Sequence, residues 1–342
     1  MKYLLLFFLI GIFALPGCHR KQYQPYRDGE LLLGTFVRIT IYDSTLNRDL
    51  MAQATDSAFR RIQQIEAHTN PFDSRSEIAR INATAKAKQP VEVSPLLLPI
   101  LRQARNVASK TDGAYDPTLW PVFRLWHFGT DSARVPEKNQ ILRNLPRVNY
   151  RNFRINSGKV QFFADSMGLD LSGISKGYAV EQARTVLKSF GFRNFIVDAG
   201  GNLGIEWHRR DSITVYIRHP RQEGTFLGSF SLARSCGVAT SGDYQDYFFQ
   251  DSVRYHHILN PKTGYPSRGV VSVTVLAPKA TQADGLSTAL FVMGKEKGMA
   301  FLRRHPDLEA VFVTIREGEL NVSASPGLAK RFRRIIPNPQ NR

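Results

Sequence analysis

One acidic and one hydroxyl side chain stand four residues apart in an otherwise apolar segment near the C-terminus. Asp284 is the only charged residue between Gln282 and Gly294, and Thr288 follows it at the spacing of one helical turn. We predict a helix that starts at Gln282, with Thr281 as its cap, and ends at Gly294. Because the rest of the segment is mostly apolar, we expect this helix to be buried on most sides.

A buried carboxylate is costly unless it has a partner, and this helix supplies no cation for Asp284. A carboxylate and a hydroxyl on one helical face form a pair of hard oxygen ligands of the kind that Mg²⁺ prefers. The alternative is that Asp284 lies in the first turn and only complements the helix dipole. The segment alone leaves both interpretations open.

A lysine lies near the junction of a short strand and a helix in the middle of the chain. We predict this helix from Ser175 to Phe190, which places Lys176 in its first turn. A cation opposes the helix dipole there, so we infer that an anion lies nearby, since a helix N-terminus with a lysine suits a phosphate. Gly173 and Gly177 would let the backbone approach such a ligand closely. The alternative is a solvent-exposed lysine.

Two adjacent histidines, His256 and His257, lie in a strand predicted from Val253 to Ile258. Neighbouring residues of a strand point to opposite faces. One histidine is therefore free to act as a general base or an aromatic wall while the other is structural. Two histidines without a third ligand do not indicate a transition-metal site.

The composition excludes several classes of function. The 342-residue chain has a formal net charge of +17, but its basic residues are scattered, without zinc-finger spacing or an RNA-binding signature. We therefore expect no nucleic-acid partner. The sequence also contains no nucleophile elbow, Walker loop, Rossmann fingerprint or zinc-protease helix. A flavin nucleotide bound in some other way stays possible.

The N-terminus is typical of an exported protein. Lys2 precedes an apolar run from Leu4 to Ala14, which is too short for an ordinary membrane span. The segment 15–18 resembles the bacterial lipoprotein cleavage box, so we predict a signal peptide over residues 1–17 and a lipid on Cys18. The chain would then be anchored to a bacterial membrane and face the periplasm. The alternative is a plain secretory signal with an incidental cysteine.

Short strands and a few helices predict a single α+β domain with mixed or antiparallel sheets flanked by helices. We expect residues 18–29 to form a lipid-anchored tether, residues 30–330 the folded domain and residues 331–342 a basic C-terminal tail. The helices are predicted at residues 49–68, 95–109, 175–190 and 282–293. The strands are predicted at residues 31–42, 153–155, 160–163, 195–197, 213–217, 225–232, 253–258, 270–276 and 309–315.

Together these segments resemble the FAD:protein FMN transferase family, the ApbE-like flavin transferases. The resemblance rests on ordered blocks at residues 33–37, 76–82, 111–118, 170–178, 199–201, 239–244, 257–264 and 284–294. It implies a single large ApbE-like domain related to the T-fold, with FAD as substrate and Mg²⁺ as cofactor. It also implies transfer of FMN to a threonine or serine hydroxyl of a partner flavoprotein, of the electron-transport type, with release of AMP.

The resemblance implies a role for each matching residue. Asp284 and Thr288 match the magnesium ligands, with Ser287 close by, and the backbone carbonyl of Gly173 matches a third ligand. The chain departs from the family pattern at Asn202, where aspartate is common, and this leaves the role of that position in doubt.

The resemblance also implies the catalytic and flavin-binding residues. His257 matches the histidine that activates the acceptor hydroxyl, and Lys176 would add a positive contact to the phosphates. Leu33 stands where methionine is usual, and Ser175 where alanine or glycine is common. The family residues that contact FAD correspond in this chain to Leu33, Phe72, Ala114, Tyr115, Asp116, Asp170, Lys176 and Ile258.

Two alternatives to protein flavinylation stay open from the sequence. Some relatives hydrolyse FAD to FMN and AMP, so a Mg²⁺-dependent FAD pyrophosphatase would use water in place of the acceptor hydroxyl. A lipid-anchored protein that only binds FAD would use the +17 charge to hold an anionic dinucleotide.

Overall fold

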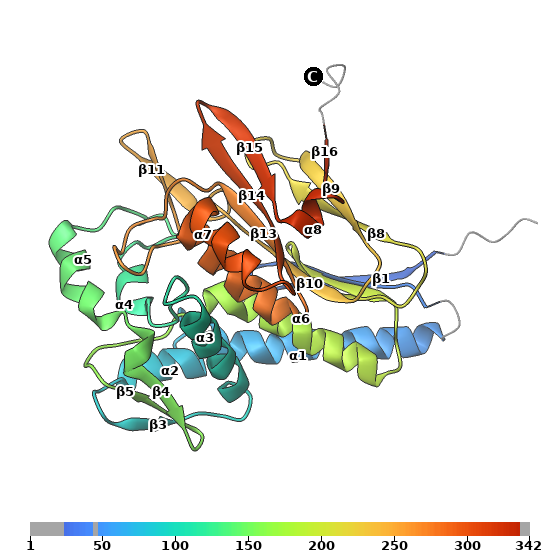
Figure 1. The fold of residues 1–342 in the computed structure, drawn as a ribbon. Coiled ribbons are helices and arrows are strands. Elements are labelled where there is room, and N and C mark those ends of the chain that lie inside the picture. The colour runs from blue at the N-terminus through green and yellow to red at the C-terminus, as the bar shows by residue number, and fades with distance from the viewer. Residues whose placement is uncertain (1–23, 44–46, 336–342) are drawn as a thin grey trace, which may run out of the picture.

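The computed structural model describes residues 24–43 and 47–335. Its centre is an eight-stranded sheet in the order β1-β2-β6-β7-β10-β13-β14-β15 (Figure 1). Every pairing in this sheet is antiparallel, which confirms the predicted α+β class. The strands are β1 (Tyr26–Leu32), β2 (Thr35–Ile41), β6 (Phe195–Ala199), β7 (Asn202–Glu206), β10 (Cys236–Gly242), β13 (Ser272–Ala277), β14 (Glu309–Arg316) and β15 (Glu319–Ala324).

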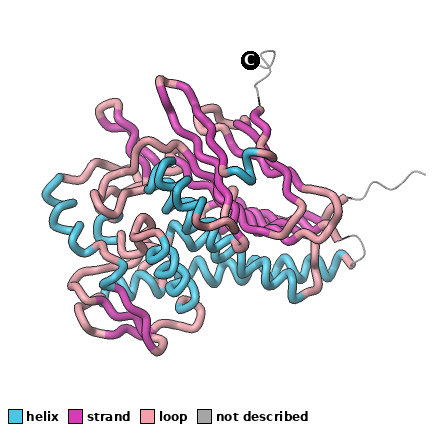
Figure 2. The backbone as a smooth tube through the Cα atoms, in the orientation of Figure 1, coloured by secondary structure: helices cyan, strands magenta, loops and turns pink. Residues whose placement is uncertain are grey.

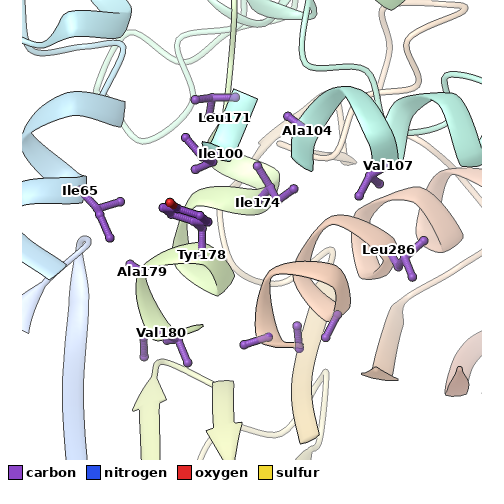
Figure 3. Close-up of a cluster of buried hydrophobic side chains, with 14 of the residues drawn as sticks. Ile65, Ile100, Ala104, Val107, Leu171, Ile174, Tyr178, Ala179, Val180 and Leu286 are labelled. Carbon is purple, nitrogen blue, oxygen red and sulfur yellow. The ribbon is translucent and has the colours of Figure 1, made fainter. Parts of the chain in front are cut away.

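Three long helices cover one face of this sheet (Figure 2). They are α1 (Arg48–Thr69), α6 (Ser172–Ser189) and α7 (Ala280–Arg303), and α6 packs against both of the others. Their apolar side chains meet those of α3 (Leu98–Lys110) in one buried cluster, in which Figure 3 shows Ile65, Ile174 and Leu286. This cluster fixes the relative positions of α6 and α7, which carry the predicted magnesium ligands and Lys176.

A three-stranded sheet covers the opposite face of the central sheet. It consists of β8 (Ile213–Arg218), β9 (Phe226–Leu232) and β16 (Arg333–Arg334). Side chains of β8 alternate between buried and exposed, as a half-covered strand requires, and pack on the central sheet in a second apolar cluster. β13 is buried along its whole length because layers lie on both of its faces.

The remaining elements are short. They are α2 (Glu77–Thr84), α4 (Trp120–Phe123), α5 (Lys138–Asn144), α8 (Pro326–Ala329), two 3₁₀ helices (Leu145–Arg147 and Tyr150–Asn152), the small sheet of β3 (Pro90–Glu92), β4 (Phe153–Asn156) and β5 (Lys159–Phe162), and the hairpin of β11 (Tyr247–Gln250) and β12 (Val253–His256).

The predicted strand over residues 31–42 is in fact a hairpin of β1 and β2. Leu33 and Gly34 form its turn with φ of 56° and 67°. Two successive residues with positive φ are typical of tight hairpin turns, but leucine rarely adopts this conformation, so a turn that begins at Leu33 is not predicted from the residue type. Because β1 begins at Tyr26, the folded domain starts before the predicted boundary at residue 30.

The C-terminal boundary also differs from the prediction. β16, at Arg333–Arg334, pairs with β9, so the first part of the predicted basic tail belongs to the fold. The rest of that tail, from residue 336, lies outside the described residues. The predicted signal peptide over residues 1–17 and the predicted lipid on Cys18 also lie outside them.

The N-terminus of α7 is capped by another helix rather than by Thr281. α7 begins at Ala280, whose backbone N–H donates to the Glu181 carboxylate of α6 at 2.9 Å. The Thr281 hydroxyl instead donates to the Gly177 carbonyl. Gly294 breaks the helical geometry with φ of 79°, where the helix end was predicted, but a second helical stretch continues to Arg303.

Gly177 lets α6 and α7 approach each other closely. A Cβ at this position would overlap the carbonyl oxygen of Ala280 and the Cβ of Asp284. We expect Gly177→Ala to push the helices apart and to lower the free energy of unfolding by about 1–3 kcal/mol. Urea denaturation measures this loss. Thr185→Ala, on the exposed side of α6, should change it by less than about 0.5 kcal/mol, and equal losses in both variants would contradict the packing argument.

Candidate active site

A cleft at the N-terminal ends of α6 and α7 gathers most of the predicted site residues. It encloses about 1140 Å³, its open mouth included. Leu33 and Ser287 do not line it. The predicted residues that do are Phe72, Ala114, Tyr115, Asp116, Asp170, Gly173, Lys176, His257, Ile258, Asp284 and Thr288.

Asp284 is buried at the inner end of the cleft, where only 5% of its surface is exposed. One carboxylate oxygen accepts the Gly177 N–H at 2.7 Å, and the Asn202 side chain also hydrogen-bonds to this carboxylate. Burial raises the pKa of Asp284, while Lys176 and these hydrogen bonds oppose the rise. Because α7 begins at Ala280, Asp284 lies beyond its first turn, so the alternative interpretation as a simple dipole partner is wrong.

The Thr288 hydroxyl and the Gly173 backbone lie against each other across α7 and α6. A Cβ built on Gly173 would lie 3.1 Å from the Thr288 Oγ1, so only glycine fits here without a shift. The Ser241 hydroxyl of β10 lies 3.3 Å from the same oxygen. The cleft therefore brings a carboxylate, a hydroxyl and a backbone segment together, and all of these offer hard oxygen atoms.

Ser287 does not line the cleft, unlike the oxygen donors Asp284, Thr288 and Gly173. Its hydroxyl donates to the Asp284 backbone carbonyl at 2.8 Å and lies 2.8 Å from the Ser241 hydroxyl. Ser241 thus connects Ser287 with Thr288. The sequence assigned no role to Ser241, although it lies in the block at residues 239–244, which was part of the family resemblance.

No group of three or more histidine, cysteine, aspartate or glutamate side chains is placed to hold a metal ion in residues 24–43 and 47–335. The predicted magnesium ligands include only one carboxylate, that of Asp284, together with the Thr288 hydroxyl and the Gly173 carbonyl. Mg²⁺ is commonly bound through one or two carboxylates, with substrate phosphates and water completing its coordination. The oxygen donors present therefore fit Mg²⁺ better than a transition metal.

Lys176 lines the cleft, but not for the reason inferred from the sequence. α6 begins at Ser172 rather than at Ser175, so Lys176 lies in its second turn and does not oppose the first-turn dipole. It is close enough to affect the pKa of both Asp284 and His257. Lys176 therefore provides a positive charge near both of the groups with predicted chemical roles.

The two histidines have separate environments. His256 is buried; its Nδ1 accepts the Ile258 N–H at 3.2 Å and its Nε2 donates to the Ser267 carbonyl at 2.8 Å. Burial lowers the pKa of His256 to about 4, so it stays neutral and structural. His257 lines the cleft and donates from Nδ1 to the Asp246 carbonyl at 3.2 Å, which leaves Nε2 unprotonated and able to accept a proton.

The outer part of the cleft is aromatic and apolar. Phe72 is 63% exposed and makes an edge contact with the Trp120 ring at 5.2 Å between centroids. Ile258 is buried in the wall. Asp116 is held by Thr118, whose backbone N–H and hydroxyl donate to it at 2.9 and 2.6 Å. Phe72 is thus free to contact a flat ring, whereas the Asp116 carboxylate mainly braces the loop.

Asp170 and Leu33 complete the set of predicted flavin contacts. The Asp170 carboxylate accepts the Ser172 N–H at 2.9 Å and thereby holds the start of α6. Its pKa is raised by burial. Leu33 lies in the β1–β2 turn and does not line the cleft, so the structure does not bring it to the other predicted residues.

Tyr115 carries a buried hydroxyl that has no hydrogen-bond partner among the described residues. Burial and the nearby carboxylates of Asp170 and Asp284 raise its pKa well above 10.0. A buried hydroxyl without a partner costs about 1–3 kcal/mol. Since Tyr115 lines the cleft, a polar group of a bound ligand would supply the missing partner.

We expect Tyr115→Phe to raise the free energy of unfolding of the ligand-free protein by about 1 kcal/mol and to weaken FAD binding about fivefold. Urea denaturation and quenching of FAD fluorescence measure the two effects. Tyr178→Phe is the matched control, because Tyr178 lies in α6 outside the cleft lining. An unchanged FAD affinity in Tyr115→Phe would rule out a contact with the ligand.

Comparison with known proteins identifies the family. The profile described as the ApbE family matches residues 33–312. An FAD:protein FMN transferase of Treponema pallidum is 34% identical, over 95% of this chain and 93% of its own. One of Vibrio cholerae is 31% identical, over 85% of this chain and 88% of its own.

Solved structures agree with the sequence comparison. The ApbE protein of Thermotoga maritima has a TM-score of 0.81 and 34% identity, over 90% of this chain and 99% of its own. The flavin transferase ApbE of Vibrio cholerae has a TM-score of 0.78 and 26% identity, over 90% of this chain and 100% of its own. The fold is thus that of the flavin transferases. This chain belongs to the ApbE family, which confirms the resemblance inferred from its sequence.

Proposed function

We propose that this chain transfers FMN from FAD to a threonine or serine hydroxyl of a partner flavoprotein and releases AMP. The observation that carries the proposal is the convergence of Asp284, Thr288, Lys176 and His257 on one cleft, in a chain whose relatives are named FAD:protein FMN transferases. Those names support the reaction type and the two substrates. The electron-transport type of acceptor is an expectation from the family resemblance.

The reaction requires one bond to form and one to break. The acceptor oxygen attacks the phosphorus of the FMN half of FAD, and the bridging oxygen leaves with AMP and with the electron pair of the broken bond. His257 Nε2 takes the proton from the acceptor hydroxyl. The Asp246 carbonyl holds the imidazole in the tautomer that this step needs. Lys176 stabilises negative charge on the phosphate oxygens.

Mg²⁺ is part of this proposal. Asp284, Thr288 and the Gly173 carbonyl would hold the ion, and it would neutralise charge on the pyrophosphate oxygens. Asn202 and Ser241 would orient these ligands, through the Asp284 carboxylate and the Thr288 hydroxyl respectively. At position 202, an amide in place of the common aspartate donates a hydrogen bond to Asp284 and adds no second negative charge.

The cellular location is likewise proposed, from the lipoprotein box that ends at Cys18. We propose that the mature protein is exported and anchored through lipid on this cysteine, facing the periplasm. The mass of the N-terminal peptide of membrane-extracted protein tests this, because an unacylated cysteine would contradict it. Among the residues that the structure describes, none of the helices is long and apolar enough to span a bilayer.

A mass spectrum tests the proposed reaction directly. The protein is incubated with FAD, Mg²⁺ and a threonine-bearing flavoprotein domain. We expect the acceptor to gain the mass of FMN less water, with one AMP released for each acceptor labelled. Release of FMN and AMP without a labelled acceptor would show that the protein hydrolyses FAD instead. Tight binding of FAD without any turnover would show that the protein only binds the flavin.

A further inference from the structure

A second cavity adjoins the cleft. We call it the arginine groove; it encloses about 1520 Å³, its open mouth included, between the β8–β9 loop and the start of the β11–β12 hairpin. Gln245 lines both the groove and the cleft, so the two adjoin at this residue. The lining residues used below are Arg218, Arg221, Glu223, Tyr247 and Arg254.

The groove has an excess of positive charge. Arg221 donates bidentate hydrogen bonds to the Asp243 carboxylate, at 2.7 Å from each of its two terminal nitrogens. The charge of Arg221 is therefore largely neutralised. Arg254 stacks over the Tyr247 ring at 4.1 Å. Arg218 is exposed at the end of β8. Among the described lining residues Glu223 is the only carboxylate, so Arg218 and Arg254 leave a net positive surface.

The hairpin beside the groove is anchored on one side and open on the other. Phe248 and Tyr255 pair across it and pack on Trp126, with ring centroids 6.4 and 5.8 Å away. The opposite side presents Tyr247 and Phe249, which are 42% and 58% exposed. Exposed aromatic rings interleaved with arginine are typical of surfaces that bind protein partners.

The same hairpin leads directly into the site. Asp246, the residue before β11, holds His257, the residue after β12, through its backbone carbonyl. An extended chain lying in the arginine groove would therefore reach the cleft at Gln245, next to the histidine with the free Nε2. Charge, exposed aromatic rings and adjacency to the cleft all point to the same occupant.

We propose that the arginine groove binds an extended segment of the acceptor protein that carries carboxylate side chains close to its reactive hydroxyl. The identification of this segment as the acceptor rests on the proposed function; the affinity of the groove for an acidic peptide does not. Arg218 and Arg254 supply the attraction, and the aromatic face of the hairpin supplies apolar contact.

Fluorescence anisotropy with a short synthetic peptide tests the proposal without requiring turnover. The probe carries one threonine flanked by aspartates, and its counterpart carries lysines in their place. We expect the acidic peptide to bind more tightly, to weaken as salt is raised, and to lose about tenfold in affinity with Arg218→Glu. Arg102→Glu is the matched control, since Arg102 is exposed on α3 and lines neither cavity.

The outcomes separate this proposal from the proposed function. FAD binding by Arg218→Glu, measured by fluorescence quenching, should equal that of the unmodified protein and shows that the variant is folded. The proposal that the groove binds an acidic segment would be wrong if both charge-reversal variants bound the peptide equally, or if the two peptides bound equally. This holds even if FMN transfer is observed. Loss of acidic-peptide binding with Arg218→Glu would support it even if no FMN is transferred.

Discussion

Asp284→Asn is expected to lower the rate of FMN transfer by about a thousandfold or more while the fold stays intact. Asparagine keeps the shape of the side chain, and its amide oxygen can still accept the Gly177 N–H. It removes the only carboxylate among the proposed magnesium ligands. The rate is measured as acceptor mass gained over time, at a series of Mg²⁺ concentrations. We expect the dependence on Mg²⁺ to weaken or vanish together with the activity.

Asp307→Asn is the control for this loss. Asp307 is exposed after the C-terminal end of α7, far along the chain from the cleft lining, and the substitution removes the same charge. Its transfer rate should match that of the unmodified protein. If Asp284→Asn kept a comparable rate and the same Mg²⁺ dependence, the proposed metal site would be wrong, whatever its effect on stability.

His257→Gln is expected to slow FMN transfer by about a hundredfold to ten-thousandfold, with FAD binding unchanged. The glutamine amide can still donate a hydrogen bond near the Asp246 carbonyl, but it cannot accept a proton at neutral pH. Single-turnover transfer and FAD fluorescence quenching measure the two effects. His68→Gln, at the C-terminal end of α1 and outside the cleft lining, is the control and should leave both unchanged.

The pH dependence gives an independent check on His257. Burial of the ring lowers its pKa below the usual 6.5, and the charge on Lys176 lowers it further, although Asp246 opposes this. Only the neutral ring can take a proton, so transfer should be constant near pH 7 and fall as the pH drops through this lowered pKa. An acid limb of the same shape in His257→Gln would assign the titration to another group.

Residues close in the sequence were placed correctly because local geometry determines them. Asp284 and Thr288 share one helical face wherever that helix packs, since their spacing matches one turn. Most of the site residues that the family resemblance then identified do line the cleft. Periodicity also predicted α1 closely, because its buried residues recur at helical spacing.

Packing between distant segments decided what the sequence left undetermined. β10 was missed because it is rich in small residues; it needs them, since a Cβ at Gly237 would overlap the backbone of Ala280 in α7. The close approach of β10 to α7 also brings Ser241 to Thr288. β7, which pairs with β6 and begins at Asn202, brings the side chain of that residue to Asp284. The choice of His257 over His256 likewise depends on contacts with Asp246 and Ser267. Helical spacing fixes distances along one element, but only the packed core fixes distances between elements.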